Sequence, residues 1–413
     1  MRAKAGLLGI VVALSGLSAC ASRSSIESAT PSTAPTSDRA TASARTPEPD
    51  VSASPSTPPE TLTWTQVPFA GTVDGVIALR GGYVAVGTID RVPTAWTSAD
   101  GEDWQSHAVA YKAPDGDFPG LPGPRMGSLV EHDGWLYAIG AYRGAGDTTV
   151  PLGWRSQDGR SWEQISSRNP FYTDGYLVLH LVSGDAGLLA LTRGFADRSG
   201  GVWLWTPDGS WQEVTPQMPA TSAGADFTDA TWADGQYVVV GNGSDGGDRD
   251  ASTWTSTDGR TWEITTPPYP WESNLDPLGV VTAVAPTPEG TWSAFLAAPG
   301  RAVGLYSTDA RSWEVTQDMM GTWSGRVETL TRVGDRLLAG GGADAAFTAQ
   351  WGGEEGSWIL VSYDGRTWHE SFRTDDVGAP VAIASNGTSV VAFGSPLMPE
   401  SSRGSVLLRL PSG

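Results

Sequence analysis

The sequence contains a single cysteine, and other residues that carry chemistry are scarce. With Cys20 alone, the chain has no internal disulfide. The histidines lie far apart, which argues against a clustered zinc site; they are His107, His132, His180 and His369. Charged residues make up only 17% of the 413 residues, while Gly (52), Pro (29) and Trp (19) are frequent. This balance favours short strands joined by turns over long amphipathic helices, and it predicts an all-β protein.

Positive charge is also scarce. The formal net charge is -20 and the pI is about 4.5, so a phosphate backbone would be repelled and nucleic acid is excluded as a partner. No phosphate-cradling glycine motif or nucleophile elbow stands out, and we predict no cofactor. The stretch Asp245–Asp250 (DGGDRD) bunches three carboxylates without the spacing of a calcium loop. We interpret it as a solvated acidic turn and predict no metal site, with calcium binding as the alternative.

Long hydrophobic runs are absent, and the clearest apolar run lies at the N-terminus. Met1–Lys4 carries two positive charges, Ala5–Leu17 is apolar, and Leu17–Cys20 (LSAC) places small residues around the cysteine. This layout is typical of a secretory signal, too short for a stable membrane span. LSAC resembles the lipobox of bacterial lipoproteins, which implies removal of residues 1–19 and acylation of Cys20, such as by palmitate. We expect an exported protein, anchored by this lipid to the outer side of the cell membrane.

A segment of low complexity follows the cysteine. From Ala21 to Glu60, 30 of 40 residues are Ala, Ser, Thr or Pro, and none is aromatic. Such a segment buries too little apolar surface to offset the entropy lost on ordering. We predict a disordered tether over residues 20–61 and a folded domain over residues 62–411.

A short motif recurs six times in this domain. The copies are SADGEDW (98–104), SQDGRSW (156–162), TPDGSW (206–211), STDGRTW (256–262), STDARSW (307–313) and SYDGRTW (362–368). Their tryptophans lie 58, 49, 51, 51 and 55 residues apart. A period near fifty residues is typical of the four-stranded blade of a β-propeller.

Strand patterns fix the number of blades. Three strands remain after the sixth motif, the last of them at Val406–Leu410, and one orphan strand, Trp64–Pro68, precedes the first motif. Together they make one further blade, so that pairing of the two chain ends closes the ring and removes exposed edges. The 350 residues from 62 to 411 give 50 per blade for seven blades, which matches the motif spacing. We predict a seven-bladed propeller closed by strand 64–68.

The motif has a clear physical role as a turn. In STDGRTW, Gly259 can adopt positive φ, Asp258 can accept backbone N–H bonds, and Trp262 can pack between neighbouring sheets. The motif resembles the Asp-box, or bacterial neuraminidase repeat, although Gly follows Asp directly here and Ala310 replaces it in the fifth copy. The resemblance implies a structural role for Asp100, Gly101, Trp104, Asp158, Gly159, Trp162, Asp208, Gly209, Trp211, Asp258, Gly259, Trp262, Asp309, Trp313, Asp364, Gly365 and Trp368.

The same resemblance raises a sialidase-like glycoside hydrolase as an alternative function. Sialidases with Asp-boxes hold a carboxylate with three arginines and carry an F/Y-R-I-P stretch, which does not occur in this chain. We therefore predict no catalytic residue. The arginines that we expect in loops are Arg91, Arg143, Arg193, Arg249, Arg326 and Arg373, and the sequence does not show whether three of them converge.

Aromatic residues in predicted loops are the candidate ligand-binding groups. The loops from the second to the third strand and from the fourth strand to the next blade open on one face, opposite the motif turns. The candidates in these loops are Phe171, Tyr172, Tyr269, Trp271, Trp323 and Trp351. Aromatics in such places stack on sugars or grip peptides, or they cap the ends of blades. We predict a non-catalytic, lipid-anchored propeller that binds an unidentified protein, peptide or glycan of the envelope, with an assembly or scaffold factor for exported proteins as a further alternative.

Overall fold

The computed structural model describes residues 62–112, 124–143, 149–165, 176–194, 200–206, 210–216, 225–244, 249–268, 279–298, 301–319, 325–343, 356–375, 378–394 and 405–411. These residues form 28 β-strands and no helix, and they belong to one compact unit, Pro58–Gly413. No helix capable of crossing a membrane occurs among them. Cys20 and the predicted signal and tether (1–19 and 20–61) lie outside the described residues.

Four-stranded antiparallel sheets account for every strand, and the first four sheets follow the chain order. Blade one contains β2 (Thr72–Leu79), β3 (Gly82–Ile89), β4 (Val92–Ser98) and β5 (Trp104–Ala108). Blade two contains β6 (Arg125–His132), β7 (Trp135–Arg143), β8 (Thr149–Ser156) and β9 (Glu163–Ile165). Blade three contains β10 (Tyr176–Gly184), β11 (Gly187–Gly194), β12 (Gly201–Trp205) and β13 (Trp211–Glu213). Blade four contains β14 (Asp226–Ala233), β15 (Gln236–Ser244), β16 (Arg249–Ser256) and β17 (Glu263–Thr265).

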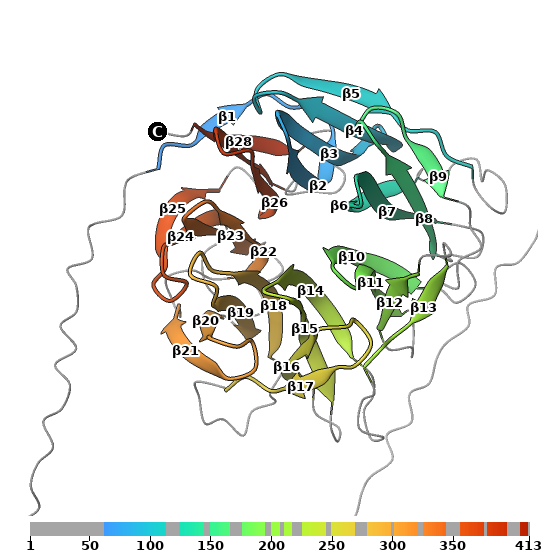
Figure 1. Cartoon of the computed structure of the whole chain (residues 1–413). Helices are drawn as coiled ribbons and strands as arrows, with labels where there is room; N and C mark the ends of the chain where they lie inside the picture. The colour runs from blue at the N-terminus through green and yellow to red at the C-terminus, as the bar shows by residue number, and fades with distance from the viewer. Residues whose placement is uncertain are drawn as a thin grey trace, which may run out of the picture. The chain divides into compact units, whose positions relative to one another are not determined.

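The last three sheets complete the ring seen in Figure 1. Blade five contains β18 (Val280–Pro286), β19 (Trp292–Ala298), β20 (Arg301–Ser307) and β21 (Trp313–Asp318). Blade six contains β22 (Arg326–Val333), β23 (Arg336–Ala343), β24 (Gly356–Ser362) and β25 (His369–Thr374). Blade seven contains β26 (Pro380–Ser385), β27 (Ser389–Gly394), β28 (Val406–Pro411) and β1 (Thr65–Val67).

The two ends of the domain pair to close the ring. Strand β1 lies antiparallel to β28, with Thr65 opposite Arg409 and Val67 opposite Leu407. Pairing of this kind covers the outer edge of β28, which would otherwise present unpaired backbone groups. The predicted seven-bladed, all-β propeller with closure by strand 64–68 is therefore confirmed.

The hydrophobic core is divided among the junctions between neighbouring blades. Because each sheet is covered on both faces, its second and third strands contain continuous buried runs rather than alternating ones. In β15, for example, Val238, Val239 and Val240 are all fully buried. Five of the third strands also carry a tryptophan that is at most 5% exposed: Trp96, Trp154, Trp203, Trp254 and Trp358. Each such ring removes roughly 200 Å² from water, so the tryptophan-rich composition reflects the packing of sheet on sheet.

Every inner strand carries a bulge near its start. The inner strands β2, β6, β10, β14, β18, β22 and β26 lie around the centre of the ring (Figure 1). Each shows a register shift against its partner strand, such as that between Phe227 and Asp229 in β14. A bulge inserts one extra residue and increases the local twist, and it turns a side chain away from the regular alternation. These strands therefore direct additional side chains toward their neighbours.

Candidate functional site

The bulge of β2 holds an ion pair between the first two inner strands. Asp74 accepts two hydrogen bonds from Arg125 of β6, one from Nε and one from Nη2. The side chain of Asp74 is 11% exposed and that of Arg125 is 60% exposed. Burial raises the pKa of Asp74, while the hydrogen bonds and charge of Arg125 act to lower it. The pair joins blades one and two near the centre of the ring.

A second carboxylate, Asp229, connects three inner strands. Its Oδ2 accepts the backbone N–H of Val284 in β18 at 3.0 Å, and its Oδ1 accepts that of Ala230 at 2.8 Å. On the other side, Nδ1 of His180 in β10 lies 3.7 Å from Oδ1. Burial raises the pKa of Asp229 above its usual range, against the effects of His180 and the two backbone donors. Both acceptor atoms of Asp229 are therefore used within the ring.

Two hydroxyl groups make corresponding contacts at other junctions. The backbone N–H of Leu181 in β10 donates to Oγ of Ser128 in β6 at 2.8 Å. Oγ1 of Thr228, in the bulge of β14, donates to the carbonyl of Val281 in β18. Four successive junctions of inner strands thus contain a polar bond between side chains or from a side chain to the backbone. Because a buried polar group without a partner is costly, these bonds fix the spacing of the blades.

The recurring motif forms the turn between the third and fourth strands, here called the box turn. Oδ1 of Asp258 accepts the Ser256 hydroxyl at 3.0 Å and the backbone N–H groups of Arg260 and Thr261 at 2.8 and 2.7 Å. The backbone donors are the main reason that the pKa of Asp258 falls to about 2. The same three bonds are made by Asp100, Asp158, Asp309 and Asp364. Asp208 and Gly209 lie outside the described residues.

The residue after the aspartate has a left-handed backbone in all five described box turns. Its φ is 60° at Ala310 and lies between 66° and 82° at the glycines, which are Gly101, Gly159, Gly259 and Gly365. Glycine adopts this conformation freely, whereas alanine pays roughly 1–2 kcal/mol there. The methyl group of Ala310 is fully buried against blade four, and this packing acts against the backbone strain.

The box tryptophans pack at the junctions of the blades. Trp313 and Trp368 are 8% and 2% exposed, while Trp104, Trp162 and Trp262 are half-buried. The indole N–H of Trp104, Trp162 and Trp313 donates to the carbonyl of the left-handed residue at 3.0–3.2 Å. Trp211 packs edge-on against Trp205, with ring centroids 5.1 Å apart. These contacts tie the turn to the strand that follows it.

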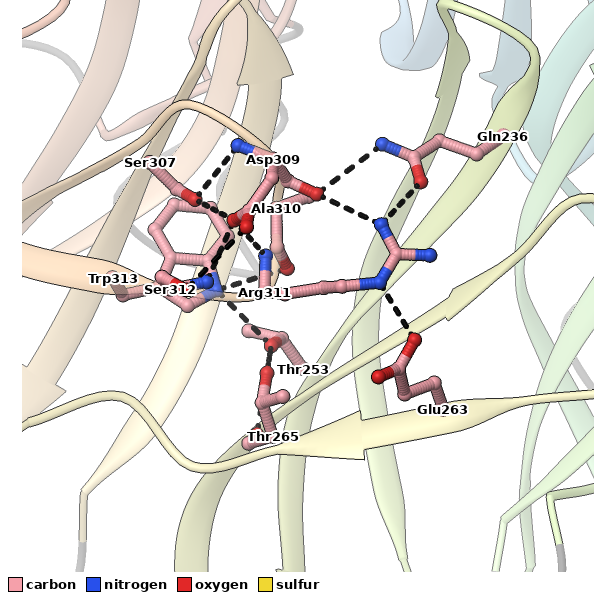
Figure 2. A network of polar contacts seen from close by, with 10 residues as sticks. All are labelled: Gln236, Thr253, Glu263, Thr265, Ser307, Asp309, Ala310, Arg311, Ser312 and Trp313. Atoms are coloured by element: carbon pink, nitrogen blue, oxygen red, sulfur yellow. Dashed lines mark hydrogen bonds and ion pairs between the residues drawn. The ribbon is translucent and has the colours of Figure 1, made fainter.

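Box turns also hold the preceding blade. Figure 2 shows this at blade five, where Nε of Arg311 donates to Oε2 of Glu263 in blade four at 2.6 Å. Nη1 of Arg311 also lies 3.2 Å from Oε1 of Gln236. From the same turn, Nε1 of Trp313 donates to Oγ1 of Thr253 at 3.1 Å. The box turn of one blade therefore contacts three strands of its neighbour.

Other junctions repeat this contact, with one reversal. Arg260 donates to Oε1 of Gln212 at 2.8 Å, and Arg366 pairs with Glu314. At the closure of the ring the cation belongs to the preceding blade, since Nη1 of Arg409 in β28 lies 2.6 Å from Glu102 of the first box turn. Nε of Arg409 also donates to the carbonyl of Asp100 at 3.1 Å. The sequence contains a signal for these contacts. An arginine follows the left-handed residue of one motif copy, and glutamate or glutamine follows the tryptophan of the copy before it.

We predict that Asp258→Ala lowers the free energy of unfolding by about 1 kcal/mol near neutral pH, as for loss of a helix N-cap. Because the folded-state pKa is about 2, below the usual 3.8, this contribution is complete above about pH 4 and is lost as the pH falls toward 2. Urea denaturation of both proteins near pH 7 and near pH 2 measures the difference. Asp335→Ala, at an exposed carboxylate in another turn, is the control. Equal stability of wild type and Asp258→Ala near pH 7 would contradict the role of this turn.

The candidate ligand-binding aromatics belong to stretches between the described strands. Phe171, Tyr172, Tyr269, Trp271, Trp323 and Trp351 all lie outside the described residues. The expectation that six arginines lie in loops was wrong for five of them, since Arg143, Arg193, Arg249, Arg326 and Arg373 lie in strands. Only Arg91 is in a turn. Of the acidic stretch 245–250, Arg249 and Asp250 belong to β16 and the rest is outside the described residues.

Solved structures of other proteins resemble this ring, whereas comparison of the sequence with protein families and curated proteins finds no match. YCF48 from Cyanidioschyzon merolae superposes with a TM-score of 0.51 at 13% identity, over 84% of this chain and 98% of that one. A Hadza microbial sialidase, Hz136, gives 0.44 at 14% identity, over 83% and 66% of the two chains. An α-L-arabinanase from Penicillium chrysogenum gives 0.45 at 12% identity, over 68% and 91%. At such identities the likeness extends to the fold alone, and the chain is a seven-bladed β-propeller.

Proposed function

We propose that this chain is a non-catalytic, lipid-anchored propeller that binds a protein, peptide or glycan of the cell envelope. The observation that carries the proposal is that the carboxylates between the inner strands are bonded to neighbouring blades. Asp74 is bonded twice to Arg125, and Asp229 is bonded to two backbone N–H groups. Carboxylates that bond neighbouring blades make the ring rigid. A rigid ring holds its loops in fixed positions, which favours ligand binding by those loops.

The aromatics between the described strands are the proposed binding residues. Tyr269 and Trp271 lie in the connection from β17 to β18, and Phe171 and Tyr172 lie in that from β9 to β10. Both connections run from an outer strand to the next inner strand, so they start and end on the same face of the ring. Aromatic side chains provide large contact areas at a low entropic cost. We place the ligand on this face, opposite the box turns.

The N-terminus supports a location at the membrane. The LSAC stretch supplies the acylated cysteine of the proposed anchor, Cys20, and residues 20–61 supply a tether. A flexible chain of about 40 residues spans on the order of 35 Å. The ring would therefore stand away from the lipid surface, with its loops free to meet other envelope components.

Photo-crosslinking in intact cells tests this proposal. A benzoylphenylalanine at position 271 should give a discrete adduct with an envelope component, and one at position 264 should not. Ile264 is the control because it lies in β17, the strand before this connection, and is 44% exposed. Equal adducts from both positions, or none from either, would contradict the proposed site. Recovery of a Cys20→Ser variant with the membrane fraction would contradict the anchor, and turnover of a fluorogenic sialoside would favour the hydrolase alternative.

A further inference from the structure

A cavity of about 430 Å³ lies on the face of the box turns, between blades one and two. Its walls come from the turn after β2, the start of β3, the end of β4 and the box turns of both blades. Ligand pockets typically span about 300–1,000 Å³, so the space suits a small molecule. This is the face opposite the one proposed above for the ligand, and the inference drawn from the cavity does not depend on that proposal.

A glycine explains why the cavity exists at this junction. In blade four the second strand starts at Gln236, which pairs with Ala233 and reaches the next box turn (Figure 2). In blade one the corresponding residue, which pairs with Leu79, is Gly82. A Cβ atom at Gly82 would lie 2.1 Å from the carbonyl oxygen of Ser98, so no side chain is tolerated there. No side chain therefore extends from Gly82 toward the box turn of blade two, as that of Gln236 does toward the box turn of blade five.

The cavity also contains two arginines whose charges are not neutralised by an ion pair within the described residues. In blade two the box arginine is Arg160, and the residue opposite it is Gln105 rather than glutamate. Across the described part of the chain, neither Arg160 nor Arg80 has an ion-pair partner. Together with burial, the charge of Arg160 lowers the pKa of the nearby His107. Both guanidinium groups are exposed and available to a ligand.

Acceptors stand beside these donors. Asp103 is exposed, and Asp158 uses Oδ1 within its own turn while no bond to its Oδ2 is found among the described residues. Arginine offers only donors and an ionised carboxylate only acceptors, while the amide of Gln105 offers both. The cavity thus presents planar donors and acceptors side by side, around Gly81 and Gly82.

We propose that this cavity binds a neutral saccharide. A phosphate or other dianion would meet the carboxylates of Asp100, Asp103 and Asp158, and a metal ion would meet the two guanidinium groups. No group of three potential metal-ligating side chains occurs among the described residues either. A sugar hydroxyl both donates and accepts, so neighbouring hydroxyls can donate to a carboxylate and accept from an arginine. Charge-assisted hydrogen bonds of this kind are stronger than neutral ones.

Saturation-transfer NMR and calorimetry with the purified chain test the proposal. The probes are glucose, galactose, mannose, N-acetylglucosamine, cellobiose and lactose, with inorganic phosphate and Ca²⁺ as competing classes. At least one saccharide is expected to bind with Kd on the order of 1 mM, or roughly 4 kcal/mol. Arg160→Gln and Asp103→Asn should each weaken binding about tenfold, which corresponds to loss of one charge-assisted bond.

The matched control is Arg260→Gln, which alters the box arginine of blade four that bonds to Gln212. It should leave saccharide binding unchanged, and thermal melting of the three variants separates loss of binding from loss of fold. Binding of no saccharide probe would overturn the proposal. Saccharide binding that neither Arg160→Gln nor Asp103→Asn weakens would also overturn it, as would binding of phosphate or Ca²⁺ alone.

Discussion

Phe393→Ala should lower the free energy of unfolding by about 3–5 kcal/mol, as expected for a large aromatic side chain removed from a core. Phe393 is fully buried in β27, where blade seven meets blade one. Its ring centroid lies 5.0 Å from that of Phe69 and 5.4 Å from that of Trp104. Phe69 lies two residues after the end of β1 at Val67, so this cluster connects the closing strand to both blades.

The position of Phe393 predicts a local effect as well. The ladder between β1 and β28 is only three residues long, and much of the support for β1 comes from side chains packed around it. Loss of the ring should therefore accelerate hydrogen exchange in β1 more than in the other strands. Urea denaturation gives the global stability, and native-state hydrogen exchange of residues 65–67 gives the local opening.

Phe227→Ala is the matched control for this experiment. Phe227 is also fully buried and packs edge-on against Trp254, with centroids 5.0 Å apart, at a junction remote from the closure. A similar global loss is expected, without a selective effect on β1. If both variants accelerated exchange in β1 equally, the closure would have no separate stability. If Phe393→Ala lost less than about 1 kcal/mol, the aromatic cluster would not support the ring.

The blade architecture was predictable because each blade repeats a local pattern. The run QYVVVG lies within β15, and the orphan segment 64–68 contains β1, since in both cases β-branched or aromatic residues are bounded by turn residues. The repetition of the motif gave information on blade length and blade number that a single copy does not contain. The spacing of the box tryptophans fixed the blade length, and the leftover strands then required a seventh blade that joins both chain ends.

Contacts between the inner strands of neighbouring blades were not predictable from the same patterns. In the sequence, Asp74 and Asp229 look like ordinary polar residues of strands. The alternation of side chains along a strand does not reveal a bulge that turns one of them toward the next strand. Their partners, Arg125 and Val284, are about fifty residues away in sequence. The binding loops stay a prediction from aromatic composition, and composition does not fix the arrangement of these loops. Pairing between side chains of the inner strands requires the geometry of the ring.

Asp229→Ala should lower the free energy of unfolding by about 1–3 kcal/mol near neutral pH. The change leaves the backbone N–H of Val284 without its acceptor at a junction of inner strands, and such a buried unsatisfied donor costs about 1–3 kcal/mol. Asp229→Asn retains an oxygen that can accept this bond and removes the buried charge. We expect it to stay within about 1 kcal/mol of wild type. Urea denaturation measures both variants.

The pH dependence distinguishes the charge of Asp229 from its hydrogen bonds. Its folded-state pKa is raised by burial, so the folded protein binds the proton more tightly than the unfolded chain. Stability from this group is therefore greatest below the usual aspartate pKa and is lost as the pH rises through the folded value. Wild type should gain stability relative to Asp229→Asn as the pH is lowered from about 7 to about 4. Asp133→Asn, at a carboxylate that is 88% exposed, is the control. A wild type that instead loses stability relative to Asp229→Asn over this range would show that the ionised carboxylate, with its two N–H donors and His180, is the form that the ring favours.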